Sequence, residues 1–269
     1  MSGAGQQQIH TRIWREEPEP NNPFATKAAY CHGYDVFGDM LGRARWVDML
    51  YLLLRGEAPT PGQGDLLEAL AVALANPGPR DASVHAAMCG GVAGSAAAAS
   101  LMAALAVGAG RHGGARELRE AMAIWQVCGN DLDAWVAAAG NASTEIDVFP
   151  ASEHPPGFDP NGMSTASSVA QLLNCLAAIA ATPHLGWLAR HRHALEAALG
   201  LPLTISGVAA AAFVDLGFSA SEGEMLYLLL RLPGAAAHAL EQEEYGFKRF
   251  PFYPVELQDD PALDRGPVR

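Results

Sequence analysis

The sequence predicts an all-α protein, and three observations support this class. Apolar residues recur at spacings of three and four, as on one face of a helix, in most segments between Gly- and Pro-containing turns. No segment shows the strict alternation of a half-buried strand or the order of a βαβ unit. Ala and Leu are frequent, and both favour helices intrinsically.

The expected helices follow one another with short breaks between them. Their apolar spacing places them over residues 46–54, 64–74, 83–107, 116–125, 169–179, 185–199, 208–216, 221–230 and 235–244. Gly56 stops the first helix, and the Asn-Pro-Gly-Pro turn at 76–79 ends the second. The small side chains of the third suit close helix–helix contact. Pro233 and the glycine after it are expected to kink or break the chain.

Composition and charge exclude several classes of protein. Half of the 269 residues are hydrophobic and only 17% are charged, which excludes disorder for most of the chain. The formal net charge of −12, without a basic stripe, argues against nucleic acid as a partner. The longest apolar tract, 92–107, is broken by Gly94 and is shorter than the ~20 residues of a membrane span.

The N-terminal residues indicate where the protein works. Residues 1–24 are polar and Pro-rich and are expected to form an arm over a surface, without the apolar region of a secretory signal. A cytoplasmic protein is therefore expected. The four cysteines (Cys31, Cys89, Cys128 and Cys175) lack the spacing of a zinc site or a disulfide framework, so no metal is expected.

His112 is a candidate for polarising a carbonyl group. It lies between a Gly-containing turn and Gly113–Gly114, directly before an expected helix. Glycines let a substrate approach the backbone, and a helix N-terminus offers N–H groups to an oxyanion. A histidine there could donate a hydrogen bond to charge developing on a carbonyl oxygen. The alternative is a Gly-rich connector with an incidental histidine.

Two arginines are candidates for binding carboxylates, which the guanidinium group holds through paired hydrogen bonds. Arg231 lies in an apolar stretch, where an unpaired charge is costly, so it pairs with a protein carboxylate or with an anionic ligand. Taken alone, the sequence favours a structural ion pair for Arg231 and surface exposure for Arg249.

Three further polar residues are weaker candidates. Asp81 and His85 are one helical turn apart, which permits a contact between them. The favoured interpretation is that Asp81 caps a helix and that His85 is its half-buried neighbour. His154 precedes two prolines in a loop and has no paired metal ligand in the sequence.

Four stretches, in order, resemble motifs of the citrate synthase superfamily, most closely its citryl-CoA lyase branch and the citrate-synthase-like part of ATP-citrate lyase. They are residues 32–36 with 51–60 (HGYDV, YLLLRGEAPT), 76–79 with 112–115 (NPGP, HGGA), 206–215 (SG to AFVD), and 231 with 237–242 (R, AHALEQ). HGGA alone is unspecific, whereas the four together, spanning about residues 11–253, are specific.

The resemblance implies a dimeric, all-helical subunit with a large domain (25–115 and 202–269) and a small domain (116–201). It implies C–C bond chemistry between an acyl-CoA and an oxo acid, with a CoA thioester and a di- or tricarboxylate as substrates and no permanently bound cofactor. In the family an aspartate removes a proton from the acyl-CoA methyl group and a histidine stabilises the enol. His112 matches that histidine, and Arg231 and Arg249 match two carboxylate-binding arginines.

The chain departs from the family at the acid–base positions. Ser206 stands where the family has its catalytic aspartate, and Pro77 stands where it has a histidine. The loop at 156–160 (PGFDP) lacks the histidine that polarises the oxo acid. A serine hydroxyl cannot replace a carboxylate base without an activating partner. The candidate substitutes are Asp159 and His154 in the loop, and Asp81 and His85 beside Pro77.

These observations support two hypotheses. The first is an acyltransferase or lyase of the citrate synthase type with a rearranged catalytic set, because His112, Arg231 and Arg249 are retained together. The second is a non-catalytic ligand- or partner-binding subunit, because the acid–base residues are lost. A carboxylate within hydrogen-bond reach of the pocket that holds His112 distinguishes the two.

Overall fold

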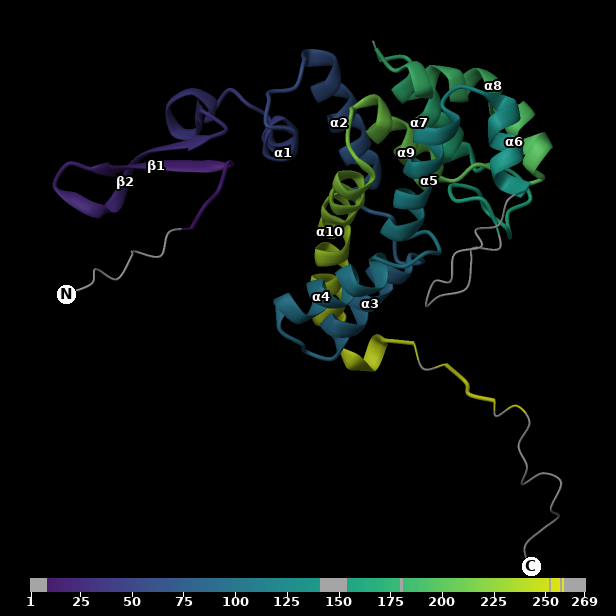
Figure 1. The fold of residues 1–269 in the computed structure, drawn as a ribbon. Helices are drawn as coiled ribbons and strands as arrows, with labels where there is room; N and C mark the ends of the chain where they lie inside the picture. The colour runs from purple at the N-terminus through teal and green to yellow at the C-terminus, as the bar shows by residue number, and fades with distance from the viewer. Residues whose placement is uncertain (1–8, 141–153, 180, 252, 257, 259–269) are drawn as a thin grey trace, which may run out of the picture.

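The computed structural model describes residues 9–140, 154–179, 181–251, 253–256 and 258. Most of these residues are helical, as predicted (Figure 1). The helices are α1 (Trp46–Arg55), α2 (Pro61–Leu74), α3 (Ala82–Val92), α4 (Ala97–Gly108), α5 (Ala115–Cys128), α6 (Leu132–Gly140), α7 (Ser167–Ala177), α8 (Pro183–Leu199), α9 (Ile205–Asp215) and α10 (Ala220–Tyr245), with a 3₁₀ turn η2 (Phe247–Arg249).

The N-terminal segment corrects the expectation that the chain has no strands. Strands β1 (Trp14–Glu19), β2 (Asn22–Cys31) and β3 (Tyr34–Asp35) form an antiparallel sheet in the order β1-β2-β3, followed by one π-helical turn η1 (Val36–Met40). Nearly all of β1 and half of β2 are solvent-exposed, whereas Ala29 and Cys31 at the end of β2 are buried. The one buried face covers only the end of β2, where residues 28–31 (AAYC) do not alternate between apolar and polar types, so the sequence gives no period-two signal.

Helix ends follow local sequence signals closely. Gly56 ends α1 in the left-handed conformation (φ 77°), as expected. Helix α2 begins at Pro61, earlier than predicted, because Thr60 accepts a hydrogen bond from Gln63 N and Pro is well suited to the first helical position. The segment 83–107 is divided into α3 and α4 at Gly94 (φ 69°). Helix α6 lies in a stretch where the sequence predicts none.

Helix α10 continues through Pro233, so the predicted break does not occur. Gly234, the next residue, donates its N–H to the carbonyl oxygen of Ala75, 2.7 Å away at the end of α2. A Cβ atom at Gly234 would lie only 2.7 Å from the same oxygen. Glycine therefore lets α2 approach α10 at the residue where the proline disturbs the helical hydrogen bonds.

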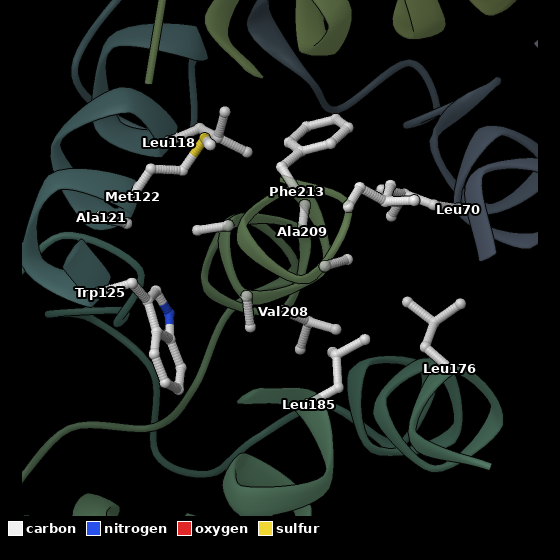
Figure 2. Packing of buried hydrophobic residues seen from close by; sticks show 14 of the residues in the cluster. Leu70, Leu118, Ala121, Met122, Trp125, Leu176, Leu185, Val208, Ala209 and Phe213 are labelled. Atoms are coloured by element: carbon white, nitrogen blue, oxygen red, sulfur yellow. The ribbon is translucent and has the colours of Figure 1, made fainter. Parts of the chain in front are cut away.

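The main core surrounds α9. Its residues Ser206 to Phe213 are all buried, and four consecutive alanines let neighbouring helices approach closely. Figure 2 shows α9 end-on, with Val208 and Phe213 enclosed by Met122 and Trp125 of α5, Leu70 of α2, Leu176 of α7 and Leu185 of α8. The N-terminus of α9 is thereby fixed in the interior.

Helix α10 connects this core to a second group of helices. It packs against α5 and α2 toward one end and against α3 and α4 toward the other (Figure 1). A smaller cluster of Val84, Ala87, Ala104, Ala235 and Ala239 fills the contact among α3, α4 and α10, as expected for small side chains. In the described part of the chain, no helix has the length and apolarity needed to cross a membrane.

Candidate functional site

A cleft of about 490 Å³ opens where several segments distant in sequence meet. Its walls come from the end of α2 and the turn after it, the start of α3, the Gly-rich turn before α5, the loop at 154–161, the start of α9, and α10. The lining residues are Ala73, Leu74, Pro77, Asp81, His112, Gly113, Glu117, His154, Phe158, Asp159, Pro160, Asn161, Thr204, Ile205, Ser206, Tyr227 and Arg231.

His112 lies at the exposed edge of the cleft, on the turn before α5. Its ring stacks on that of His154, with the centroids 6.2 Å apart. Gly113 adopts a positive φ of 69°, and a Cβ atom at Gly114 would lie 2.2 Å from the carbonyl oxygen of Gly110. This turn therefore requires both glycines, and it presents the imidazole beside the N-terminus of α5.

Glu117, in the first turn of α5, places a buried carboxylate in the cleft wall. It is 4% exposed. One oxygen accepts from Gly113 N (2.5 Å), and the other accepts from Gly157 N (3.1 Å) and from the Ser206 hydroxyl (2.8 Å). Three donors thus compensate the negative charge that burial would otherwise disfavour.

Ser206 is held between a hydroxyl and this carboxylate. Its Oγ lies 2.7 Å from the Oγ1 of Thr204 and donates to Glu117. The loop at 154–161 is fixed against the same helix end, because Thr204 N donates to the Gly157 carbonyl (3.0 Å) and Gly207 contacts Gly157 directly. Ser206 stands at the position where the family that the motifs resemble has an aspartate. In this chain the carboxylate at that place comes from Glu117, which Ser206 contacts.

Arg231, on α10, is buried and already paired. Its Nη2 donates to Asp81 Oδ2, its Nη1 donates to the Gly113 carbonyl (3.2 Å), and its guanidinium lies 4.7 Å from the centre of the Tyr227 ring. Asp81 also caps α3 by accepting from Ser83 N at 2.9 Å. The sequence-based preferences for an ion pair at Arg231 and a helix cap at Asp81 both agree with this geometry.

Tyr227 contributes a hydroxyl that stays protonated at neutral pH. Burial raises the pKa of its phenol from 10.0 to about 12, with further raising contributions from Glu117 and Asp81, while the nearby Arg231 guanidinium opposes the rise. A protonated hydroxyl can donate a hydrogen bond to an oxygen atom of a bound molecule.

The remaining candidates divide into two groups. Asp159 and His154 line the cleft, and Asp159 accepts a hydrogen bond from Asn161 N at 2.9 Å. His85 lies outside the cleft, with its ring 6.1 Å from that of Phe250. Arg249 is exposed on η2 and does not line the cleft of its own chain, and its role in binding substrate stays a prediction. Among the described residues, no three metal-ligating side chains form a group that could hold an ion.

Two residues of the cleft, Glu117 and Tyr227, are missing from the sequence-based candidates, although the sequence contains a signal for each. Glu117 precedes Ala121 by four residues and therefore lies on the buried stripe of α5, where an acidic residue is unusual. Tyr227 precedes Arg231 by one helical turn and shares its face of α10. Neither spacing indicates which other segments the residue meets.

Comparison with solved structures finds similar folds. The citryl-CoA lyase of Hydrogenobacter thermophilus superposes with a TM-score of 0.67 and 18% identity, over 96% of this chain and 100% of that chain. ATP citrate lyase of Methanothrix soehngenii, solved with citrate and coenzyme A, superposes with a TM-score of 0.69 and 18% identity, over 95% of this chain and 43% of that chain. Citrate synthase of Thermoplasma acidophilum, solved with carboxymethyl coenzyme A and oxaloacetate, superposes with a TM-score of 0.57 and 15% identity, over 82% of this chain and 60% of that chain.

The chain therefore has the fold of the citrate synthase superfamily, as its motifs implied. It spans less than half of the ATP citrate lyase chain and the whole of the citryl-CoA lyase chain. No family model and no curated protein sequence matches it. The likeness thus establishes the fold, whereas activity depends on the residues of the cleft.

Proposed function

We propose that this protein makes or breaks a carbon–carbon bond between an acyl-CoA and an oxo compound, as in the synthesis of citrate or the cleavage of citryl-CoA. The observation that supports this proposal most directly is that His112, Arg231 and the buried carboxylate of Glu117 line one cleft in a protein with this fold. The carboxylate matters most, because the serine at the family's aspartate position cannot by itself remove a proton from carbon.

In the direction of synthesis, Glu117 accepts a proton from the carbon next to the thioester carbonyl. The electrons of the broken C–H bond form the enol C=C bond, and His112 stabilises the thioester oxygen by donating a hydrogen bond. The enol carbon then attacks the oxo carbonyl, and its C=C electrons form the new C–C bond. The former oxo oxygen takes up a proton from solvent, and Glu117 returns the proton that it accepted to solvent. Cleavage is the reverse sequence, in which the carboxylic acid returns its proton to carbon.

Ser206 supports this role for Glu117 by its position. Its hydroxyl lies between Thr204 and the carboxylate, at 2.7 and 2.8 Å, and it fixes one carboxylate oxygen. Gly113 N and Gly157 N fix the group from two further segments. A base with so few degrees of freedom is well positioned for transfer of a proton from a bound methyl group.

The second hypothesis, a non-catalytic binding subunit, also has a specific observation in its favour. Arg231 is engaged by Asp81, and Pro77 and Ser206 carry no ionisable group at two of the family's acid–base positions. A protein that only binds a CoA compound would keep the cleft and need no base. The homodimer and the cytoplasmic location stay predictions under either hypothesis.

Proton exchange tests the proposal independently of the oxo partner. Acetyl-CoA is incubated with the protein in D₂O, and deuterium in its methyl group is followed by mass spectrometry; release of thiol with oxaloacetate, and cleavage of citryl-CoA, are assayed in parallel. We expect exchange with the unaltered protein and a loss of roughly 10²–10⁴-fold in Glu117→Gln.

Glu224→Gln is the matched control, because Glu224 lies on α10, pairs with Arg119 and does not line the cleft. Its exchange rate should equal that of the unaltered protein. Equal rates in Glu117→Gln and the unaltered protein would exclude Glu117 as the base. Absence of exchange, thiol release and citryl-CoA cleavage in a protein that CoA stabilises against heat would favour the binding subunit.

A further inference from the structure

The ion pair between Arg231 and Asp81 changes what the cleft can hold. A free guanidinium binds a carboxylate through parallel hydrogen bonds from its two outer nitrogens. Here Nη2 donates to Asp81 and Nη1 donates to the Gly113 carbonyl, so each outer nitrogen already has a protein acceptor and the Asp81 carboxylate neutralises the guanidinium charge. A substrate carboxylate that took the same pair of outer nitrogens would have to displace a protein carboxylate that also caps α3.

The charges around the pair oppose a second anion. Asp81, Glu117 and Asp159 line the cleft with three carboxylates, whereas Arg231 is the one arginine or lysine among its described lining residues. The formal charges of the three carboxylates and Arg231, with the histidines counted as uncharged, sum to −2. A di- or tricarboxylate would therefore enter a field of its own sign, where the one cation of the described lining is already paired with Asp81.

The rest of the lining suits an uncharged molecule. Leu74, Pro77, Phe158 and Ile205 give the cleft apolar walls. Tyr227 supplies a neutral polar group, because burial keeps the phenol protonated, and His112 adds an imidazole N–H at the edge of the cleft. Such a lining can bind a carbonyl or hydroxyl oxygen on an otherwise apolar molecule.

We propose that Asp81 determines specificity: by occupying Arg231 it excludes a carboxylate from this subsite, so the oxo partner of the C–C bond reaction is a neutral ketone or aldehyde. This inference rests on the proposed function for the reaction type. It concerns only the partner of the acyl-CoA, and it separates this chain from proteins that bind citrate or oxaloacetate.

The test compares two ligands that share one carbon skeleton, oxaloacetate and its dimethyl ester, by titration calorimetry against the unaltered protein and Asp81→Asn. Asparagine keeps the cap of α3, because its side-chain oxygen still accepts from Ser83 N. The unaltered protein should bind the ester in preference to the dianion. In Asp81→Asn, the affinity for oxaloacetate should rise by roughly tenfold or more.

Asp159→Asn is the matched control, because it removes the same charge from the same cleft and no contact joins Asp159 to Arg231 among the described hydrogen bonds and ion pairs. Its affinity for oxaloacetate should rise clearly less. An equal rise in both variants, tight binding of oxaloacetate by the unaltered protein, or no binding of the dianion by Asp81→Asn would each overturn the proposal. Deuterium exchange into acetyl-CoA, measured on the same samples, reports separately on the proposed reaction.

Discussion

At the scale of single residues, the cleft depends on polar groups that burial would normally disfavour. Glu117 and Arg231 are both almost inaccessible, and each is compensated by groups from other segments. Their positions along the helices are visible in the sequence, but their partners are not. Removing a partner leaves a buried charge, so substitutions here affect stability and function together.

The raised pKa of Tyr227 predicts how the free energy of unfolding depends on pH. Below pH 10 both folded and unfolded chains keep the phenolic proton. Between pH about 10 and 12 only the unfolded chain loses it, because burial raises the folded pKa to about 12. Stability should therefore fall across this window, by on the order of 2 kcal/mol, and the decline should end above it.

Urea midpoints measured against pH for the unaltered protein and Tyr227→Phe test this expectation. The variant should lack that part of the decline. Burial also raises the pKa of Tyr51, which both proteins retain, so the difference between the curves isolates Tyr227. Parallel curves from pH 9 to 12 would show that Tyr227 ionises alike in both states.

At the scale of elements, the start of α9 and the loop at 154–161 have to approach almost to backbone contact. A Cβ atom at Gly207 would lie 2.5 Å from the carbonyl oxygen of Gly157, whose φ is 90°. Glycines at both positions let the loop press against the helix end that carries Ser206. This approach brings Gly157 N within 3.1 Å of Glu117.

Gly207→Ala should therefore destabilise the protein by about 1–3 kcal/mol, because the loop must move. Gly186→Ala is the matched change in another helix, α8, where a Cβ atom would meet nothing within 4 Å. It should stabilise by roughly 0.5–1 kcal/mol, since alanine favours helix over glycine. Melting temperatures measured by circular dichroism should fall for Gly207→Ala and rise for Gly186→Ala. A change of the melting temperature in the same direction for both variants would contradict the packing argument.

At the scale of the whole molecule, stability is concentrated in the helices around α9 (Figure 2). Phe213→Ala removes a fully buried ring there and should cost about 3–5 kcal/mol. Phe24→Ala changes a ring on β2 that is 98% exposed and should alter stability by less than about 0.5 kcal/mol. Urea denaturation of both variants measures the contrast, and similar losses would show that the exposed sheet is part of the cooperative unit.

The helices could be predicted because their signals are local. The 3.6-residue period and the glycine after α1 act within a few residues, and they place most helices near their observed bounds. The cap at Thr60 is equally local but does not enter that prediction, which therefore places the start of α2 too late. The strands could not be predicted, since β1 is almost wholly exposed and the buried end of β2 (AAYC) does not alternate between apolar and polar residues. Pro233 was wrongly expected to interrupt α10, because the contact of Gly234 with α2 joins residues far apart in sequence.

The sequence by itself determined the all-helical class, the family that the fold resembles, and the candidacy of His112, Asp81 and Arg231. The tertiary structure alone decided which groups meet: it brought Glu117 to Ser206 across 89 residues and Asp81 to Arg231 across 150. The physical reason is the distance along the chain over which each interaction acts. Helix periodicity and capping are local, whereas the compensation of a buried charge depends on packing between segments that sequence order does not relate.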